Sequence, residues 1–130
     1  MNKLEEEDLA RVMEVIRHAV EADEQNDTAF ALRIMTAVVE EFPELAIGHG
    51  YLGWILSRSG QYREAIDHGR VGVQLSPESE RVSLLLFRVL LAAGERDLAF
   101  EEMKRFLSAR KSEEYSKLLA EWKEISDEVQ

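Results

Sequence analysis

The chain of 130 residues contains no cysteine, only two prolines and only seven glycines. The absence of cysteine excludes disulfide frameworks, thiolate nucleophiles and zinc or iron–sulfur sites held by cysteine. So few prolines and glycines cannot supply the turns of an all-β protein, and the sequence has none of the short β-branched runs typical of an α/β protein. We therefore predict an all-α fold.

Basic residues are also scarce. The sequence has 16 lysines and arginines against 26 acidic residues, which gives a formal net charge of −10. This acidity argues against a nucleic-acid partner, because a phosphate backbone would be repelled. No long apolar stretch follows the start of the chain, so we expect neither a secretory signal nor a membrane span, and a cytoplasmic location by default. The apolar fraction of 45% suits a single soluble domain spanning 1–130.

Three features recur along the chain with a spacing of 34 residues. The turn residues are Asn26, Gly60 and Gly94. A small residue lies five positions after each turn: Ala31, Ala65 and Ala99. The segment ends carry Pro43 in the first copy, Pro77 in the second and Lys111 in the third. Each unit is predicted to be a helix, a turn and a second helix that crosses the first closely at the alanine. The units are 12–45, 46–79 and 80–113.

The middle unit resembles the tetratricopeptide repeat (TPR). It carries the residues of that motif at matching positions: Leu52, Gly53, Gly60, Tyr62, Ala65, Ile66, Leu75 and Pro77. The other units keep fewer of them: Leu86, Leu90, Gly94, Ala99 and Phe106 in the third, and Ala31, Val38 and Pro43 in the first. The resemblance implies a right-handed superhelical solenoid of three helix-turn-helix repeats. The usual leading tryptophan is replaced by Val15, His49 and Ser83, and glycines at 69 and 72 predict a thin second helix in the middle repeat.

Segments outside the repeats are predicted to be helical as well. Residues 1–11 extend the first helix. Residues 114–130 form a capping helix that covers the last apolar face of the array, after Ser112 as N-cap. Its apolar face is formed by Tyr115, Leu118, Leu119, Trp122, Ile125 and Val129.

A binding surface follows from the resemblance, because in this family the first helix of each unit lines a concave groove. The residues predicted to bind a partner there are Arg17, Val20, Ile47, Tyr51, Trp54, Arg58, Arg81, Leu84, Arg88 and Leu91. Tryptophan, tyrosine and arginine dominate the energetics of protein interfaces, which favours this surface. Two alternatives stay open: Tyr51 and Trp54 could pack as core, and Arg17 could pair with a local carboxylate.

Some TPR domains grip a C-terminal carboxylate with lysine, asparagine and arginine side chains. The matching positions here are Ile16, Val20, Tyr51, Arg81 and Leu85, of which only Arg81 has suitable chemistry. The acidic tails of heat-shock chaperones are therefore not the expected ligands. The mixture of apolar and cationic residues instead favours a segment that carries apolar anchors and acids.

The only group worth testing as a metal site is Glu14, His18 and Glu21, which helical spacing places on one face. No second helix offers matching ligands, and we interpret His18 as a partly buried structural histidine. His49 and His68 are isolated from acidic or nucleophilic partners in the sequence pattern. We therefore predict no catalytic residues, no metal and no cofactor.

The sequence thus predicts a non-catalytic protein–protein interaction module that binds a peptide or helical segment of a partner. A small dedicated chaperone is the first alternative, on a resemblance to the three-repeat chaperones of bacterial type III secretion in size, acidity and repeat number. The second alternative is a self-assembling scaffold in which the groove receives the terminus of another copy, so self-association is a possible property.

Overall fold

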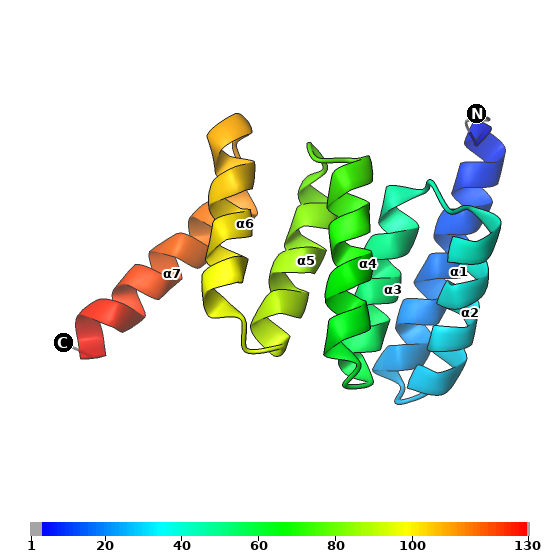
Figure 1. The fold of residues 1–130 in the computed structure, drawn as a ribbon, viewed down its shortest axis with the longest axis horizontal. Coiled ribbons are helices and arrows are strands. Elements are labelled where there is room, and N and C mark those ends of the chain that lie inside the picture. The colour runs from blue at the N-terminus through cyan, green and yellow to red at the C-terminus, as the bar shows by residue number, and fades with distance from the viewer. Residues whose placement is uncertain (1–3, 130) are drawn as a thin grey trace.

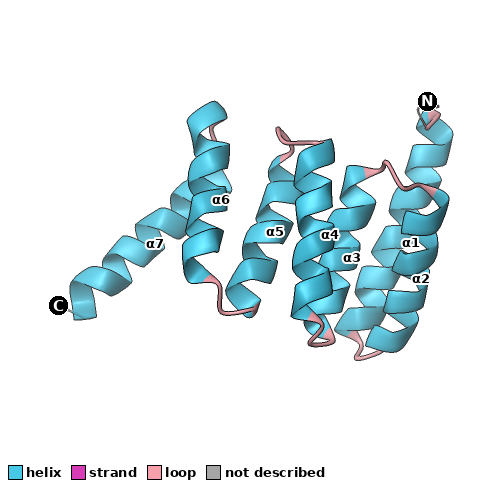
Figure 2. Cartoon of the chain, in the orientation of Figure 1, coloured by secondary structure: helices cyan, strands magenta, loops and turns pink. Residues whose placement is uncertain are grey.

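The computed structural model describes residues 4–129, with side chains through residue 124. These residues form seven α-helices and no strand (Figure 2). The helices are α1 (Glu6–Glu24), α2 (Thr28–Glu41), α3 (Ala46–Arg58), α4 (Tyr62–Leu75), α5 (Glu80–Ala92), α6 (Arg96–Ala109) and α7 (Glu113–Val129). The all-α prediction is confirmed. None of the helices within residues 4–129 is long and apolar enough to cross a membrane.

The helices stack as successive pairs along one direction. Within the pairs, α1 packs against α2, α3 against α4 and α5 against α6, while α3 also contacts α1, α2 and α5. In Figure 1 the even-numbered helices α2, α4 and α6 lie nearer the viewer than α1, α3 and α5, and the two ends of the chain lie at opposite ends of the array. This arrangement is a solenoid of three helix pairs followed by a C-terminal helix.

The predicted turn residues close the first helix of each pair in a left-handed backbone conformation. Asn26, Gly60 and Gly94 have φ angles of 69°, 82° and 81°. Glycine adopts this conformation without the steric cost of a Cβ atom, and asparagine tolerates it better than most residues. The repeat spacing was therefore visible in the sequence because each turn requires one of a few residue types at one position.

The core consists of two clusters that follow one another along the array. The first joins α1 to α4 with one residue of α5, and the second joins α5, α6 and the start of α7. Ala31, Ala65 and Ala99, predicted to lie at helix crossings, have no exposed surface. Such small side chains let paired helices approach closely while the larger residues around them fill the core.

The middle helices pack with almost no side chain between them. A Cβ atom added at Gly53 of α3 would lie 2.8 Å from the carbonyl oxygen of Ala65 in α4. One added at Gly69 of α4 would lie 2.8 Å from Leu86 Cδ1 in α5. Contacts this short do not occur between real Cβ atoms and their neighbours. The contact at position 53 is with backbone, so glycine is required there for the observed spacing of α3 and α4, whereas at position 69 the end of the Leu86 side chain would have to move. The predicted thin helix in the middle repeat is α4.

A pair of histidines joins α3 to α4, although the sequence pattern left both isolated. His49 is buried and its Nε2 lies 2.7 Å from the Pro43 carbonyl oxygen, which can only accept a hydrogen bond. His49 Nε2 therefore donates, and its Nδ1 accepts from His68 Nδ1 at 3.1 Å when both rings are neutral. The rings are stacked, with centroids 5.3 Å apart. Partial burial lowers the pKa of His68, and the neighbouring His49 lowers it further.

A buried polar network attaches α7 to the array. The Ser112 hydroxyl accepts from the Tyr115 amide, as predicted for an N-cap. The Tyr115 hydroxyl donates to Ser83 Oγ (2.7 Å), because the Ser83 hydroxyl uses its own hydrogen to donate to Glu102 (2.6 Å). Arg105 in turn donates to both carboxylate oxygens of Glu102. The Tyr115 side chain is fully buried, and this burial raises its pKa.

α7 slants away from α6 toward the C-terminus (Figure 1). Leu118 and Leu119 still pack on the second cluster, whereas residues 120–124 are exposed. Continuing the repeat period into α7 puts polar residues at positions where the first helices of the repeats pack: Lys117, Glu121 and Glu124. α7 therefore does not stack as the first helix of a fourth repeat. Its described capping contacts come from Leu118, Leu119 and the ring of Trp122, which lies 5.4 Å from that of Phe100 in α6. Ile125 and Val129 of the predicted face lie outside the described side chains.

Overpacking a helix crossing tests the observed core. Ala65→Leu and Ala99→Leu should each lower the free energy of unfolding by about 1 to 3 kcal/mol, because the added atoms force two closely packed helices apart. Ala37→Leu, at an exposed position of α2, is the matched control and should change stability little. Chemical denaturation compares the three variants, and equal stabilities would contradict the assigned crossings.

The histidine pair makes a pH-dependent contribution to stability. Since the pKa of His68 is lowered in the folded protein, the unfolded chain binds the proton more tightly, and the free energy of unfolding should fall as the pH drops from about 7.5 to 5.5. His68→Asn should show a smaller loss over that interval. An NMR titration of the His68 ring should give a midpoint below about 6.5, the ordinary histidine value. A midpoint above it would show that the pair does not disfavour the charged ring.

Candidate partner-binding surface

One side of α3 links to both neighbouring helices. Arg58 Nε donates to Asp23 Oδ2 of α1 at 3.1 Å, and the Tyr51 hydroxyl accepts from Arg81 Nη1 of α5 at 2.9 Å. Trp54 lies between Tyr51 and Arg58 on the same helix. These contacts, together with the helical spacing of the other predicted residues, indicate one surface across α1, α3 and α5. We call this surface the α1–α3–α5 face, formed by Val20, Ile47, Tyr51, Trp54, Arg58, Arg81, Arg88 and Leu91.

The apolar part of the face lies mainly on α3. Ile47, Tyr51 and Trp54 are half-buried, and all three pack against the first core cluster. They are therefore neither free surface residues nor members of a closed core. One side of each ring or chain is held by the core, and the other is accessible to a partner.

The charge of Arg58 is already compensated. Its partner Asp23 is 3% exposed and also accepts a hydrogen bond from the Thr28 hydroxyl at 2.6 Å. A buried carboxylate is costly unless it is paired, so Arg58 stabilises the end of α1 and the turn after it. Arg58 therefore lies at the edge of the face but offers a partner no unpaired charge.

Arg17 is compensated along its own helix. Its guanidinium donates to Glu14 and Glu21, one turn before and one turn after it. The hydrogen bond and the charge of Glu14 raise the pKa of Arg17, and Arg17 in turn lowers the pKa of Glu14. This is the alternative that the sequence left open, and we therefore do not count Arg17 among the cations of the face.

Two arginines of α5 present uncompensated charge. Arg81 and Arg88 are exposed, and among the side chains of residues 4–124 no carboxylate lies within ion-pair distance of either. Within the described side chains, the Tyr51 hydroxyl accepts the one side-chain hydrogen bond of Arg81. The two residues are seven positions apart, so two helical turns, about 10 Å, separate them along α5. The face is thus apolar on α3 and cationic on α5.

Leu84 does not belong to the face, and its prediction as a partner-binding residue is wrong. Only 5% of its surface is exposed, and it lies in the second core cluster together with Tyr115 of α7. Helical spacing correctly assigned Leu84 to the side of α5 that carries Arg81 and Arg88. Helical spacing could not show that the second core cluster covers Leu84.

The prediction that His18 is a partly buried residue is also wrong, because 62% of its side chain is exposed. It lies 4.0 Å from Glu14 and 3.9 Å from Glu21, both of which already bind Arg17. Within the described part of the chain, no group of three or more histidine or acidic side chains could hold a metal ion.

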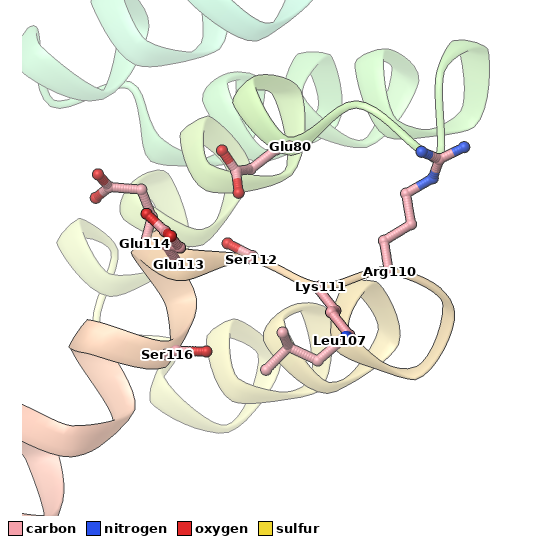
Figure 3. Close-up of a pocket in the computed structure, with 8 residues that line it drawn as sticks. All are labelled: Glu80, Leu107, Arg110, Lys111, Ser112, Glu113, Glu114 and Ser116. Carbon is pink, nitrogen blue, oxygen red and sulfur yellow. The ribbon is translucent and has the colours of Figure 1, made fainter.

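Two hollows in the surface lie away from the face. One, of about 700 Å³, is at the junction of α6 and α7. In Figure 3, Glu80 comes from the start of α5 and Glu113 and Glu114 from the start of α7, while Arg110 extends away from them. The second, of about 380 Å³, lies between α4 and α6 over Leu86 and Leu90, with a rim of both charge signs. Neither hollow concentrates charge of one sign.

The described fold is similar to those of several solved structures. "First TPR of Spaghetti (RPAP3) bound to HSP90 peptide SRMEEVD" covers 89% of this chain and 95% of its own, with 12% identity and a TM-score of 0.70. The CopN-Scc3 complex covers 94% and 71%, with 20% identity and a TM-score of 0.68. A mutant of MamA covers 78% and 74%, with 19% identity and a TM-score of 0.62. The sequence matches no model of a protein family and no curated protein. These likenesses establish the TPR fold of the chain.

The two kinds of arginine on the face should respond differently to truncation. Arg58→Ala leaves the buried carboxylate of Asp23 without its cation and should lower the free energy of unfolding by about 1 to 3 kcal/mol. Arg88→Ala removes an exposed side chain without a partner and should change stability by less than about 0.5 kcal/mol. Thermal and chemical denaturation measure both, and the reverse order would contradict the assigned pairing.

Proposed function

We propose that this TPR solenoid is a non-catalytic protein-interaction module, and that its α1–α3–α5 face binds a segment of a partner protein. One observation carries the proposal: half-buried Tyr51, with Trp54 about one turn further along α3, contacts Arg81 of α5, and the exposed Arg81 and Arg88 have no carboxylate partner among the side chains of residues 4–124. Folding alone does not require exposed arginines beside accessible aromatic rings. Such a combination favours binding, because these residue types supply area, planarity and forked hydrogen-bond donors.

The rings on α3 suit the role of binding anchors. Since Tyr51 and Trp54 are already packed against the core on one side, they lose little rotational freedom when a partner covers the other side. Tyr51 also holds Arg81 by its hydrogen bond, so that guanidinium is partly oriented before binding. Preorganised groups of this kind bind more tightly than flexible ones that bury the same area.

The two sides of the face define the chemistry of the partner. The partner presents apolar side chains to α3 and acidic side chains to α5. Acids seven positions apart on a helix have the spacing of about 10 Å that matches Arg81 and Arg88. At physiological salt the charges of a distant surface are screened beyond about 8 Å, so these local arginines act despite the acidity of the whole chain.

A solved neighbour supports this chemistry. The peptide named with the TPR domain of Spaghetti, SRMEEVD, combines acidic residues with methionine and valine. In the present chain only Arg81 has suitable chemistry among the positions that grip a C-terminal carboxylate. We therefore propose that side-chain carboxylates within the bound segment, rather than a chain terminus, meet the arginines.

Selection from a displayed library of random peptides tests the proposal, because such a library offers the face segments of every composition. The wild-type protein should enrich peptides that combine aromatic or aliphatic residues with aspartate or glutamate. Arg88→Glu should lose the acidic enrichment, and its affinity for the peptides selected on the wild type should fall at least about tenfold, because like charges then face one another.

Arg63→Glu on α4 is the matched control, since it makes the same change at an exposed position away from the face. It should select the same peptides as the wild type. A library that yields no enrichment, or acidic peptides that bind Arg88→Glu as well as the wild type, would refute this role of the α1–α3–α5 face.

A further inference from the structure

The second half of α7 is only partly packed on its own chain, in so far as its side chains are described, through residue 124. Residues 120–124 are exposed, and Trp122 keeps 44% of its surface accessible although its ring lies 5.4 Å from that of Phe100. In Figure 1 this half of α7 extends beyond α6 toward the C-terminus. An exposed indole at the end of an array is a feature that a binding partner would explain.

The sequence of this segment is chemically complementary to the α1–α3–α5 face. Exposed Glu121 and Glu124 stand on either side of Trp122 and Lys123, and the sequence continues with acidic and apolar residues through Val129, so acids outnumber the one base of the segment. Glu128 follows Glu121 by seven positions, which is also the separation of Arg81 and Arg88 on α5. Two helices with these spacings repeat their charges at the same distance, about 10 Å.

We propose that the second half of α7 of one copy binds the α1–α3–α5 face of a second copy. The acidic residues of α7 lie against Arg81 and Arg88 of α5, and Trp122 lies against the accessible sides of Tyr51 and Trp54. The inference rests on the proposed function of that face and names one occupant of it, a segment of the chain itself. The occupant matches the partner chemistry of apolar anchors and acids derived above.

The association is expected to be weak and reversible. Two or three turns of one helix bury well under the roughly 1,200 Å² typical of stable protein interfaces. The net charge of −10 on each copy opposes approach at low ionic strength and is screened at physiological salt. A weakly bound α7 leaves the face available to a partner that binds more tightly, so self-association regulates access to the binding surface by competition.

Sedimentation velocity of the full-length chain across a wide concentration range tests the inference. The wild type should associate as its concentration rises. Arg88→Glu and Glu121→Arg should each weaken this association at least about tenfold, because each places like charges against one another. Both substituted positions are exposed, so both variants should keep the wild-type circular dichroism and melting temperature.

A mixture of the two variants provides the decisive arm. The glutamate introduced on α5 of one variant then faces the arginine introduced on α7 of the other, and the mixture should recover association that neither variant shows alone. The controls Arg63→Glu and Glu101→Arg make the same changes on α4 and α6 at exposed positions away from both surfaces. They should associate as the wild type does.

Three results would overturn the inference: a wild type that stays monomeric at every concentration, association that survives Glu121→Arg, or a mixture that fails to recover it. A monomeric wild type that still selects acidic peptides through Arg88 would overturn the self-association alone and leave the proposed function intact. A wild type that selects no such peptides but associates through Arg88 and Glu121 would keep the interface and refute the binding of other proteins.

Discussion

The close approach of α3 to α4 is the constraint on which the array depends. α3 contacts four other helices, and its glycine at position 53 lies against the backbone of Ala65 without room for a side chain. Gly72 of α4 is similarly tight, since a Cβ atom there would lie 3.1 Å from the Ala46 carbonyl oxygen. With the packing side of α3 fixed in this way, Tyr51 and Trp54 are held on its opposite side, between α1 and α5.

The repeat architecture could be predicted because it rests on local requirements of the backbone. Each turn needs a positive φ angle, which restricts Asn26, Gly60 and Gly94 to a few residue types, and each crossing needs a small side chain such as Ala65. The direction of α7 depends instead on which side of a helix finds a complementary surface. The apolar residues of α7 were visible in the sequence, but the number of turns that pack on α6 was not.

The positions of the candidate binding residues on their helices were predicted in outline, and the structure corrects their surroundings in detail. Helical spacing assigns a residue to one side of its helix and leaves open what covers that side, which is why Leu84 is core and Arg17 is neutralised by its own helix. The pairing of His49 with His68 depends on the distance between two helices. It could have been sought from the antiparallel arrangement of α3 and α4 about Gly60, which brings residues at similar distances from the turn together.

The central claim is that partners meet the chain on the α1–α3–α5 face. The chain carries two tyrosines suited to a comparison: Tyr51 on the face, and Tyr62 at the start of α4, which is 41% exposed. A photo-crosslinking phenylalanine analogue at either position conserves an aromatic ring, and irradiation in a cell lysate records which position touches another polypeptide. The account predicts crosslinked products, to a partner or to a second copy, from position 51 and few from position 62; abundant products from position 62 with none from position 51 would contradict it.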